Sequence, residues 1–241
     1  MRVLFTRPAG QAEELGAVLT AQGIEWLGEP LLRIVPIPWD PGALAGKAAL
    51  LVTSANASRE LLRVPGVRRD LPTFAVGPAT AEPLQTAGFS NVQVAGGTAV
   101  SLIAYVRRHA DPGAGRFLHL SGFDISLDLG AGLAPAGFTV DRVVVYRAVA
   151  VERMNAGVMR EITHARFDAA MFLSARTAAV FCSLVIAAGL VEACSRMTAV
   201  VISRKVALAL QPAGFHQVVV AASPSRDGVV EAILRLKAED A

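Results

Sequence analysis

The feature that most limits the possible folds is a regular alternation of short β-rich runs with helical patterns. The predicted strands are Val3–Thr6, Ala49–Thr53, Thr73–Val76, Val92–Ala95, Phe117–Leu120, Ala169–Leu173, Thr198–Ile202 and Val218–Ala221. Their sequences are apolar on both faces, and helices of about ten to fifteen residues separate them, a pattern typical of parallel sheets covered on two sides. The sequence therefore predicts an α/β fold with doubly wound parallel sheets.

An internal repeat indicates two similar domains. Residues 74–95 and 200–221 share nine identities in 22 aligned positions, and weaker matches extend this repeat on both sides. Residues 2–35 match residues 116–149 in the same way. The middle copy of the longer repeat runs directly into the second copy of the shorter one, so we expect these two segments to form one inserted domain. The first copy of the shorter repeat, residues 2–35, is then expected to form a domain with the end of the chain.

These matches set the expected domain limits. A discontinuous domain would contain residues 1–35 and 150–241, and the inserted domain would contain residues 38–145. Two chain crossings, at about 31–38 and 140–151, would connect them. Both crossings are extended and rich in β-branched residues, which favours pairing as a two-stranded β-ladder linker. A ligand cleft is expected between the domains.

Composition limits the possible partners. Hydrophobic residues make up 53% of the chain and charged residues 18%, so the composition of a disordered chain is absent. The net charge of +3 without a basic stripe suits an acidic small molecule better than nucleic acid. The apolar stretch Thr177–Val191 is too short to span a membrane, and the N-terminus lacks the apolar core of a signal peptide. We expect a cytoplasmic monomer with no membrane partner.

Polar residues gather at the predicted carboxyl ends of the strands, where open α/β sheets bind ligands. The candidate ligand-binding residues are Arg7, Thr53, Ser54, Asn56, Gly77, Thr80, Ser121, Ser174, Arg176, Ser203 and Arg204. Any single Ser, Thr or Asn there could equally be a helix N-cap that accepts from free backbone N–H groups. Together, hydroxyls, arginines and helix N-termini favour a carboxylate or phosphate ligand.

Motifs for nucleotide cofactors and metals are missing from the sequence. It contains no G-x-x-x-x-G-K-[ST] loop, no G-x-S-x-G elbow, and no G-x-G-x-x-G after the first strand. The two cysteines fit no metal-binding pattern, and the four histidines are not grouped. His119 lies inside a predicted strand and is interpreted as structural. We therefore expect neither a cofactor nor a metal.

Tyr146 is one of only two tyrosines and lies in the second crossing, within Val143–Arg147. One interpretation is an aromatic side chain packed on the β-ladder, as expected for its repeat partner Leu32. The other is a phenol that faces the ligand. A phenol is neutral at neutral pH and can donate a proton to a departing hydroxyl group.

Five segments together resemble the uroporphyrinogen-III synthase family. They are Val3–Pro8, Leu51–Ala57, Phe74–Ala81, Val143–Arg147 and Phe172–Ala175. None is specific alone, but their order and spacing cover nearly the whole chain. The resemblance implies two α/β domains, one of them discontinuous, joined by a β-ladder.

The resemblance also implies an activity. The family cyclises the linear tetrapyrrole hydroxymethylbilane to uroporphyrinogen III, a reaction that inverts the terminal D ring through a spiro intermediate and needs no cofactor. By this resemblance Tyr146 is the candidate acid, and Thr53, Ser54, Thr80 and Ser174 are substrate-binding residues. In the second repeat, Ser203–Val206 replaces the Gly-Pro-x-Thr of many members, so a hydroxyl contact there could be replaced by cationic ones.

Two alternatives stay open. Duplicated α/β domains around an acidic-ligand cleft also describe non-catalytic binding proteins, although those usually carry a signal peptide. An enzyme of nucleotide or sugar-phosphate metabolism is the other alternative, which the missing glycine motifs disfavour.

Overall fold

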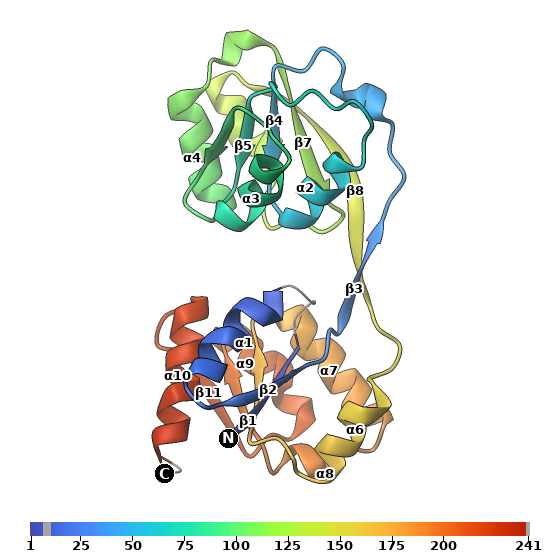
Figure 1. The fold of residues 1–241 in the computed structure, drawn as a ribbon, viewed down its shortest axis with the longest axis vertical. Helices are drawn as coiled ribbons and strands as arrows, with labels where there is room; N and C mark the ends of the chain where they lie inside the picture. Colours follow the sequence, from blue (N-terminus) through green and yellow to red (C-terminus); the bar gives the residue numbers. More distant parts are fainter. Residues whose placement is uncertain (7–10, 240–241) are drawn as a thin grey trace. The chain divides into compact units, whose positions relative to one another are not determined.

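The chain forms two compact units (Figure 1) in a computed structural model that describes residues 1–6 and 11–239. Unit 1 contains Met1–Arg33 and Val149–Ala241, and unit 2 contains Ile34–Ala148. The predicted domain limits, at 35–38 and 145–150, lie close to these divisions. Each unit is described below by itself.

Unit 1 is built on a parallel sheet of five strands in the order β11-β10-β9-β1-β2. The strands are β1 (Arg2–Phe5), β2 (Glu25–Gly28), β9 (Ala169–Phe172), β10 (Thr198–Val201) and β11 (Gln217–Val220). The helices are α1 (Gln11–Ala21), α6 (Ala156–Thr163), α7 (Ala175–Ala187), α8 (Val191–Cys194), α9 (Arg204–Leu210) and α10 (Arg226–Glu239). The short turn η4 (Gln211–Ala213) follows α9.

Helices cover both faces of this sheet. Successive strand residues point to opposite faces, so Val3 and Phe5 pack in the core beneath α1 and α10, whereas Leu4 packs in the core beneath α6–α9. This two-sided burial explains why the central strands β1, β9 and β10 are apolar at nearly every position rather than at alternate ones.

Unit 2 contains a sheet with strand order β3-β8-β7-β4-β5-β6. The strands are β3 (Leu32–Pro36), β4 (Ala49–Val52), β5 (Thr73–Ala75), β6 (Val92–Val94), β7 (Arg116–Gly122) and β8 (Thr139–Ala150). The helices are α2 (Ala55–Leu62), α3 (Pro78–Thr86), α4 (Ala99–His109) and α5 (Leu129–Leu133). The short turns are η1 (Pro41–Leu44), η2 (Pro112–Ala114) and η3 (Ala134–Ala136).

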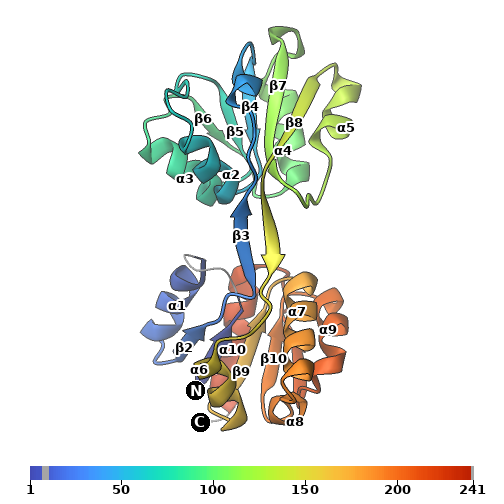
Figure 2. The same cartoon turned by 90° about the vertical axis from the view of Figure 1, so that its right-hand side faces the viewer.

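This second sheet is also covered on both faces. Helices α2 and α3 lie to one side and α4 and α5 to the other (Figure 2). Leu51 packs with α4 and α5, whereas its neighbours Leu50 and Val52 pack with α2 and α3. Strands β4 to β7 and the first half of β8 are parallel. The predicted α/β class with parallel sheets is therefore confirmed.

Strand β8 is long enough to have two neighbours, β7 along Thr139–Tyr146 and β3 near its end. Ile37 N–H donates to the Val145 carbonyl at 2.9 Å, and Val151 N–H donates to the Leu31 carbonyl at 3.1 Å. Residue numbers decrease along the first segment, from 37 to 31, as they increase along the second, from 145 to 151, so β3 and β8 are antiparallel. These are the two segments, 31–38 and 140–151, that the sequence suggested would pair.

One strand differs from the sequence analysis. Strand β2 was not predicted, because its sequence Glu-Trp-Leu-Gly lacks the run of apolar and β-branched residues that marks the predicted strands. Helix α3 begins at Pro78, since Gly77 serves as its N-cap and proline is well suited to the first helical position.

Candidate functional site

The carboxyl edge of the unit 2 sheet brings together hydroxyl groups from separate strands. Thr53 and Ser54 directly follow β4, and Ser54 is the N-cap of α2, where its Oγ accepts from Ala57 N–H at 3.1 Å. The N-cap interpretation of Ser54 is therefore correct. Both side chains nevertheless remain half-buried rather than fully enclosed, so capping does not remove them from the surface of this edge.

Tyr146 reaches the same edge from β8. Its hydroxyl donates to Ser54 Oγ at 2.9 Å. A β-bulge directs it there: Ser121 pairs with Val144, but the next residue, Gly122, pairs with Tyr146, so one residue of β8 is left over. Bulges re-aim side chains in this way and are frequent beside active sites. The ring thus packs on the sheet, as the first interpretation expected, and its hydroxyl is directed at Ser54.

The ring of Tyr146 lies directly over Gly122. A Cβ at Gly122 would lie 2.7 Å from Tyr146 Cζ and 2.8 Å from its hydroxyl oxygen, which is closer than nonbonded atoms approach. Glycine is required here by close contact rather than by an unusual backbone conformation.

We expect Gly122→Ala to displace the Tyr146 ring and break its hydrogen bond to Ser54. Overpacking of this kind should lower the free energy of unfolding by about 1–2 kcal/mol. Chemical denaturation measures the loss. The control is Gly113→Ala, whose Cβ would have the Asp111 carboxylate as its nearest contact, at 3.2 Å. Equal stability of the two variants would show that the ring moves aside without penalty.

His119 is the main residue whose role the sequence analysis missed. It lies in β7 with 1% of its surface exposed, and its Nε2 shares a hydrogen bond with Thr53 Oγ1 at 3.1 Å. Burial, assisted by the positive charge of Arg142 and opposed by Asp128, lowers the pKa of His119 to about 4. The imidazole is therefore neutral at neutral pH and orients the Thr53 hydroxyl. Its only sequence signal is a polar residue within an otherwise apolar strand.

Arg142 was also missed, and it holds the end of β7. Its guanidinium donates to Ser121 Oγ at 2.8 Å and to the carbonyls of Gly122 and Phe123 at 2.9 and 2.8 Å. Ser121 itself is completely buried. The predicted ligand-binding Ser121 therefore serves here as an acceptor for Arg142, which fixes the turn that leads out of β7.

A cavity of about 130 Å³ lies beside these groups within unit 2. Its lining residues are Thr53, Ala99, His119, Gly122, Asp124, Ile125, Ser126, Leu127 and Tyr146. The cavity thus combines the Tyr146 and Thr53 side chains with the loop that follows β7. The cavity is smaller than the roughly 300–1,000 Å³ of a pocket that encloses a whole ligand, but its polar groups converge, so it could receive part of a larger ligand.

Two other predicted residues of unit 2 lie apart from this cavity. Asn56 Oδ1 accepts from the guanidinium of Arg59 at 3.1 Å. Thr80 is only 5% exposed, and its carbonyl accepts from Ser58 Oγ at 2.7 Å. The backbone of Thr80 therefore links α3 to α2 by a hydrogen bond, and its side chain is buried.

The corresponding edge of unit 1 carries the remaining predictions. Ser174 caps α7, accepting from Thr177 N–H at 3.1 Å, and its hydroxyl also shares a hydrogen bond with Thr177 Oγ1 at 2.7 Å. Ser203 is the N-cap residue of α9 but makes no side-chain capping bond. Arg176 and Arg204 are exposed in the first turns of these helices. Arg7 lies outside the described residues.

A sequence profile of the family described as "Uroporphyrinogen-III synthase HemD" matches residues 13–231. The chain belongs to the uroporphyrinogen-III synthase family. This confirms the resemblance noted in the sequence, and it makes the protein an enzyme of tetrapyrrole and heme biosynthesis.

Solved structures of the same description share the fold. A crystal structure of uroporphyrinogen-III synthetase from Helicobacter pylori is 21% identical and covers 98% of this chain and 100% of its own, with a TM-score of 0.62. A mutant uroporphyrinogen III synthase from the extremely thermophilic bacterium Thermus thermophilus is 20% identical and covers 100% of both chains, with a TM-score of 0.52. A search of curated proteins found no match.

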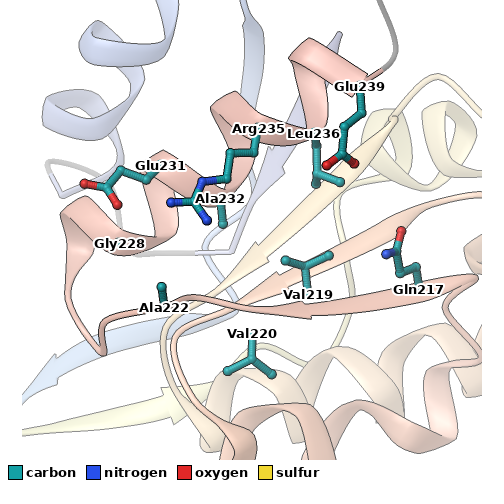
Figure 3. A pocket seen from close by; sticks show the side chains of 10 residues that line it. All are labelled: Gln217, Val219, Val220, Ala222, Gly228, Glu231, Ala232, Arg235, Leu236 and Glu239. Carbon is teal, nitrogen blue, oxygen red and sulfur yellow. The ribbon is translucent and has the colours of Figure 1, made fainter.

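A second cavity, of about 260 Å³, lies in unit 1 between the edge strand β11 and α10 (Figure 3). Its charged lining residues are Glu231, Arg235 and Glu239, which leave it with an excess of negative charge. Such a lining would repel the acidic ligand expected for a synthase of this family. None of the predicted site residues contributes to it.

Metal-binding and membrane-spanning features were searched for in the described part of the chain. Among residues 1–6 and 11–239, no group of three or more His, Cys, Asp or Glu side chains could hold a metal ion. In the same part, no helix is both long and apolar enough to cross a membrane.

Proposed function

We propose that this protein is the lyase that converts hydroxymethylbilane to uroporphyrinogen III with loss of water and inversion of ring D. The hydrogen bond between Tyr146 and Ser54 beside the unit 2 cavity is the observation that carries this proposal. It places a phenolic hydroxyl, which can donate a proton, at the carboxyl edge of the sheet, next to the N-terminus of α2 and the hydroxyls of Thr53 and Ser54. Membership of the family supplies the substrate and the reaction.

The chemistry proceeds from a reactive substrate, so the protein must mainly orient it. Tyr146 gives its proton to the departing hydroxyl of the hydroxymethyl group, which leaves as water. The pyrrole that loses water keeps its N–H proton and is left as an azafulvenium cation, and the substituted position of ring D attacks its methylene carbon to form a protonated spiro-pyrrolenine. The bond from that position of ring D to its original methylene bridge then breaks, and the free position of ring D attacks the methylene cation so released to close the macrocycle. The proton lost from this position as the pyrrole becomes aromatic returns to the phenolate.

The site is suited to stabilising Tyr146 both as a phenol and as a phenolate during this reaction. While Tyr146 is a phenolate, the Ser54 hydroxyl can turn and donate across the same 2.9 Å contact. Ser54 begins α2, whose N-terminal end favours negative charge. The same end of the helix favours a substrate carboxylate, so we propose Thr53 and Ser54 as substrate-binding residues, with Ser174, Arg176, Ser203 and Arg204 serving this role in unit 1.

A product-isomer assay tests the function. Hydroxymethylbilane is generated in the presence of the protein, the products are oxidised, and type I and type III isomers are separated by chromatography. Without enzyme the substrate closes to type I, so we expect type III in excess only when the protein is present. Activity should survive dialysis against a chelator, since the proposed reaction needs no cofactor.

The opposite result would be equally clear. If a folded, monodisperse sample yields only type I, the protein is not a synthase. A non-catalytic protein that binds acidic small molecules would then be the better description, and it could be tested with a panel of polycarboxylates and phosphates.

A further inference from the structure

A short apolar loop follows β7 and lies beside the proposed acid. In the part of the chain that the structure describes, nine large apolar side chains are exposed, and three of them, Phe123, Ile125 and Leu127, fall within five residues. Their exposed fractions are 65%, 36% and 39%. Single exposed apolar residues are ordinary, but a cluster beside a polar cavity indicates a contact surface.

The backbone at the start of this loop is held in place. Phe123 N–H donates to the Tyr146 carbonyl at 2.8 Å, and the guanidinium of Arg142 donates to the Phe123 carbonyl at 2.8 Å. The phenyl ring of Phe123 is therefore exposed, but the backbone that carries it is fixed by a hydrogen bond to the main chain of Tyr146. Leaving such a ring in water forgoes a substantial hydrophobic contribution to folding, which suggests that the ring serves a purpose outside the folded core.

The loop and the polar groups face the same space. Ile125 and Leu127 line the 130 Å³ cavity together with Thr53, His119 and Tyr146. Most of the cavity wall is polar, and Ile125 and Leu127 supply a smaller aliphatic part of it. Phe123 does not line the cavity but begins the same loop, so its exposed ring extends the aliphatic part outside the cavity. A flat ring with apolar faces and a polar rim matches such a wall, and the pyrrole rings of a tetrapyrrole have this character.

We propose that Phe123, Ile125 and Leu127 form an apolar contact surface for the face of one pyrrole ring of the substrate, next to Tyr146. This inference rests on the proposed function. The surface would bind the ring by stacking and aliphatic contact, and it would keep water away from the hydroxyl that Tyr146 protonates.

The test compares Phe123→Ala with the wild-type enzyme in the product-isomer assay. We expect KM for hydroxymethylbilane to rise about tenfold, equivalent to about 1.4 kcal/mol, with a smaller change in kcat. Phe123→Leu should fall between the two proteins because it keeps part of the apolar surface. The melting temperature should not change, since the ring is largely exposed.

Ile186→Ala is the matched control. Ile186 is 52% exposed but lies in the last turn of α7 in unit 1, away from the carboxyl edge of its sheet. Its removal should leave KM unchanged, which would separate a local contact from a general effect of losing surface apolar area.

The outcomes are distinct. If the wild-type protein forms no type III isomer, the proposed function fails and this inference fails with it. If the wild-type protein forms type III but Phe123→Ala keeps the wild-type KM, only the inference is overturned. It is also overturned if sedimentation shows that Phe123→Ala dissociates a wild-type dimer while KM stays the same, because the loop would then be an interface between copies of this chain.

Discussion

Replacing Tyr146 by phenylalanine should lower the turnover number by several-fold to a few hundredfold, which reaches the lower part of the roughly 10²–10⁴-fold that a positioned proton donor contributes. The change removes one oxygen and its hydrogen bond to Ser54 Oγ. It keeps the ring that packs against Gly122, so the fold should be preserved. KM should change little, because the proposed role concerns the departing hydroxyl rather than binding.

The second tyrosine provides the control for this prediction. Tyr105 lies in α4, where its ring stacks on His109 with centroids 4.0 Å apart. Tyr105→Phe makes the same chemical change away from the cavity and should leave turnover unaltered. The test compares the rates of type III formation by the wild-type protein and the two variants, after their melting temperatures have been shown to match. Wild-type turnover in Tyr146→Phe would restrict Tyr146 to packing on the β-ladder.

Acidification should destabilise the protein through His119. Burial lowers the pKa of His119 to about 4 in the folded state, assisted by Arg142 and opposed by Asp128, whereas an exposed histidine titrates near 6.5. Between these values the unfolded chain binds a proton that the folded chain does not. Stability from this group is therefore complete above pH 6.5 and is lost as the pH falls towards 4. The total loss is about 3 kcal/mol.

Comparison with His119→Gln isolates this contribution from those of other groups. Glu29 acts in the opposite direction, because burial raises the pKa of its carboxyl group and outweighs the hydrogen bond from Asn155 N–H, so its contribution grows on acidification. Both proteins share Glu29, so the difference between their pH slopes reports His119 alone. We expect urea unfolding between pH 7 and 4.5 to show a steep slope for the wild-type protein and a shallower one for His119→Gln.

The control here is His216→Gln, since His216 is exposed in unit 1. It should retain the wild-type dependence of stability on pH. Equal slopes for wild-type protein and His119→Gln would mean that the folded protein accommodates the imidazolium, and that Thr53 is oriented without help from a neutral ring.

Much of the fold could be predicted because its signals are local. Short runs rich in apolar and β-branched residues marked eight strands, among them the edge strands β6 and β11. Strand β2 was missed because its sequence Glu-Trp-Leu-Gly contains no β-branched residue. Gly88 and Gly214, which follow α3 and η4, both have positive φ, a backbone conformation that favours glycine at the end of a helix.

The sequence by itself determined the α/β class, the repeated units and the edge at which polar residues gather, because periodicity and strand ends follow from neighbouring residues. Only the tertiary structure decided which side chains meet there. Ser54 and Tyr146 are 92 residues apart in sequence, and Thr53 and His119 are 66 apart. Their contacts depend on strand register, on a bulge opposite Gly122 and on burial that keeps an imidazole neutral. None of these is a property of a local segment, since each arises only when separate strands pack together.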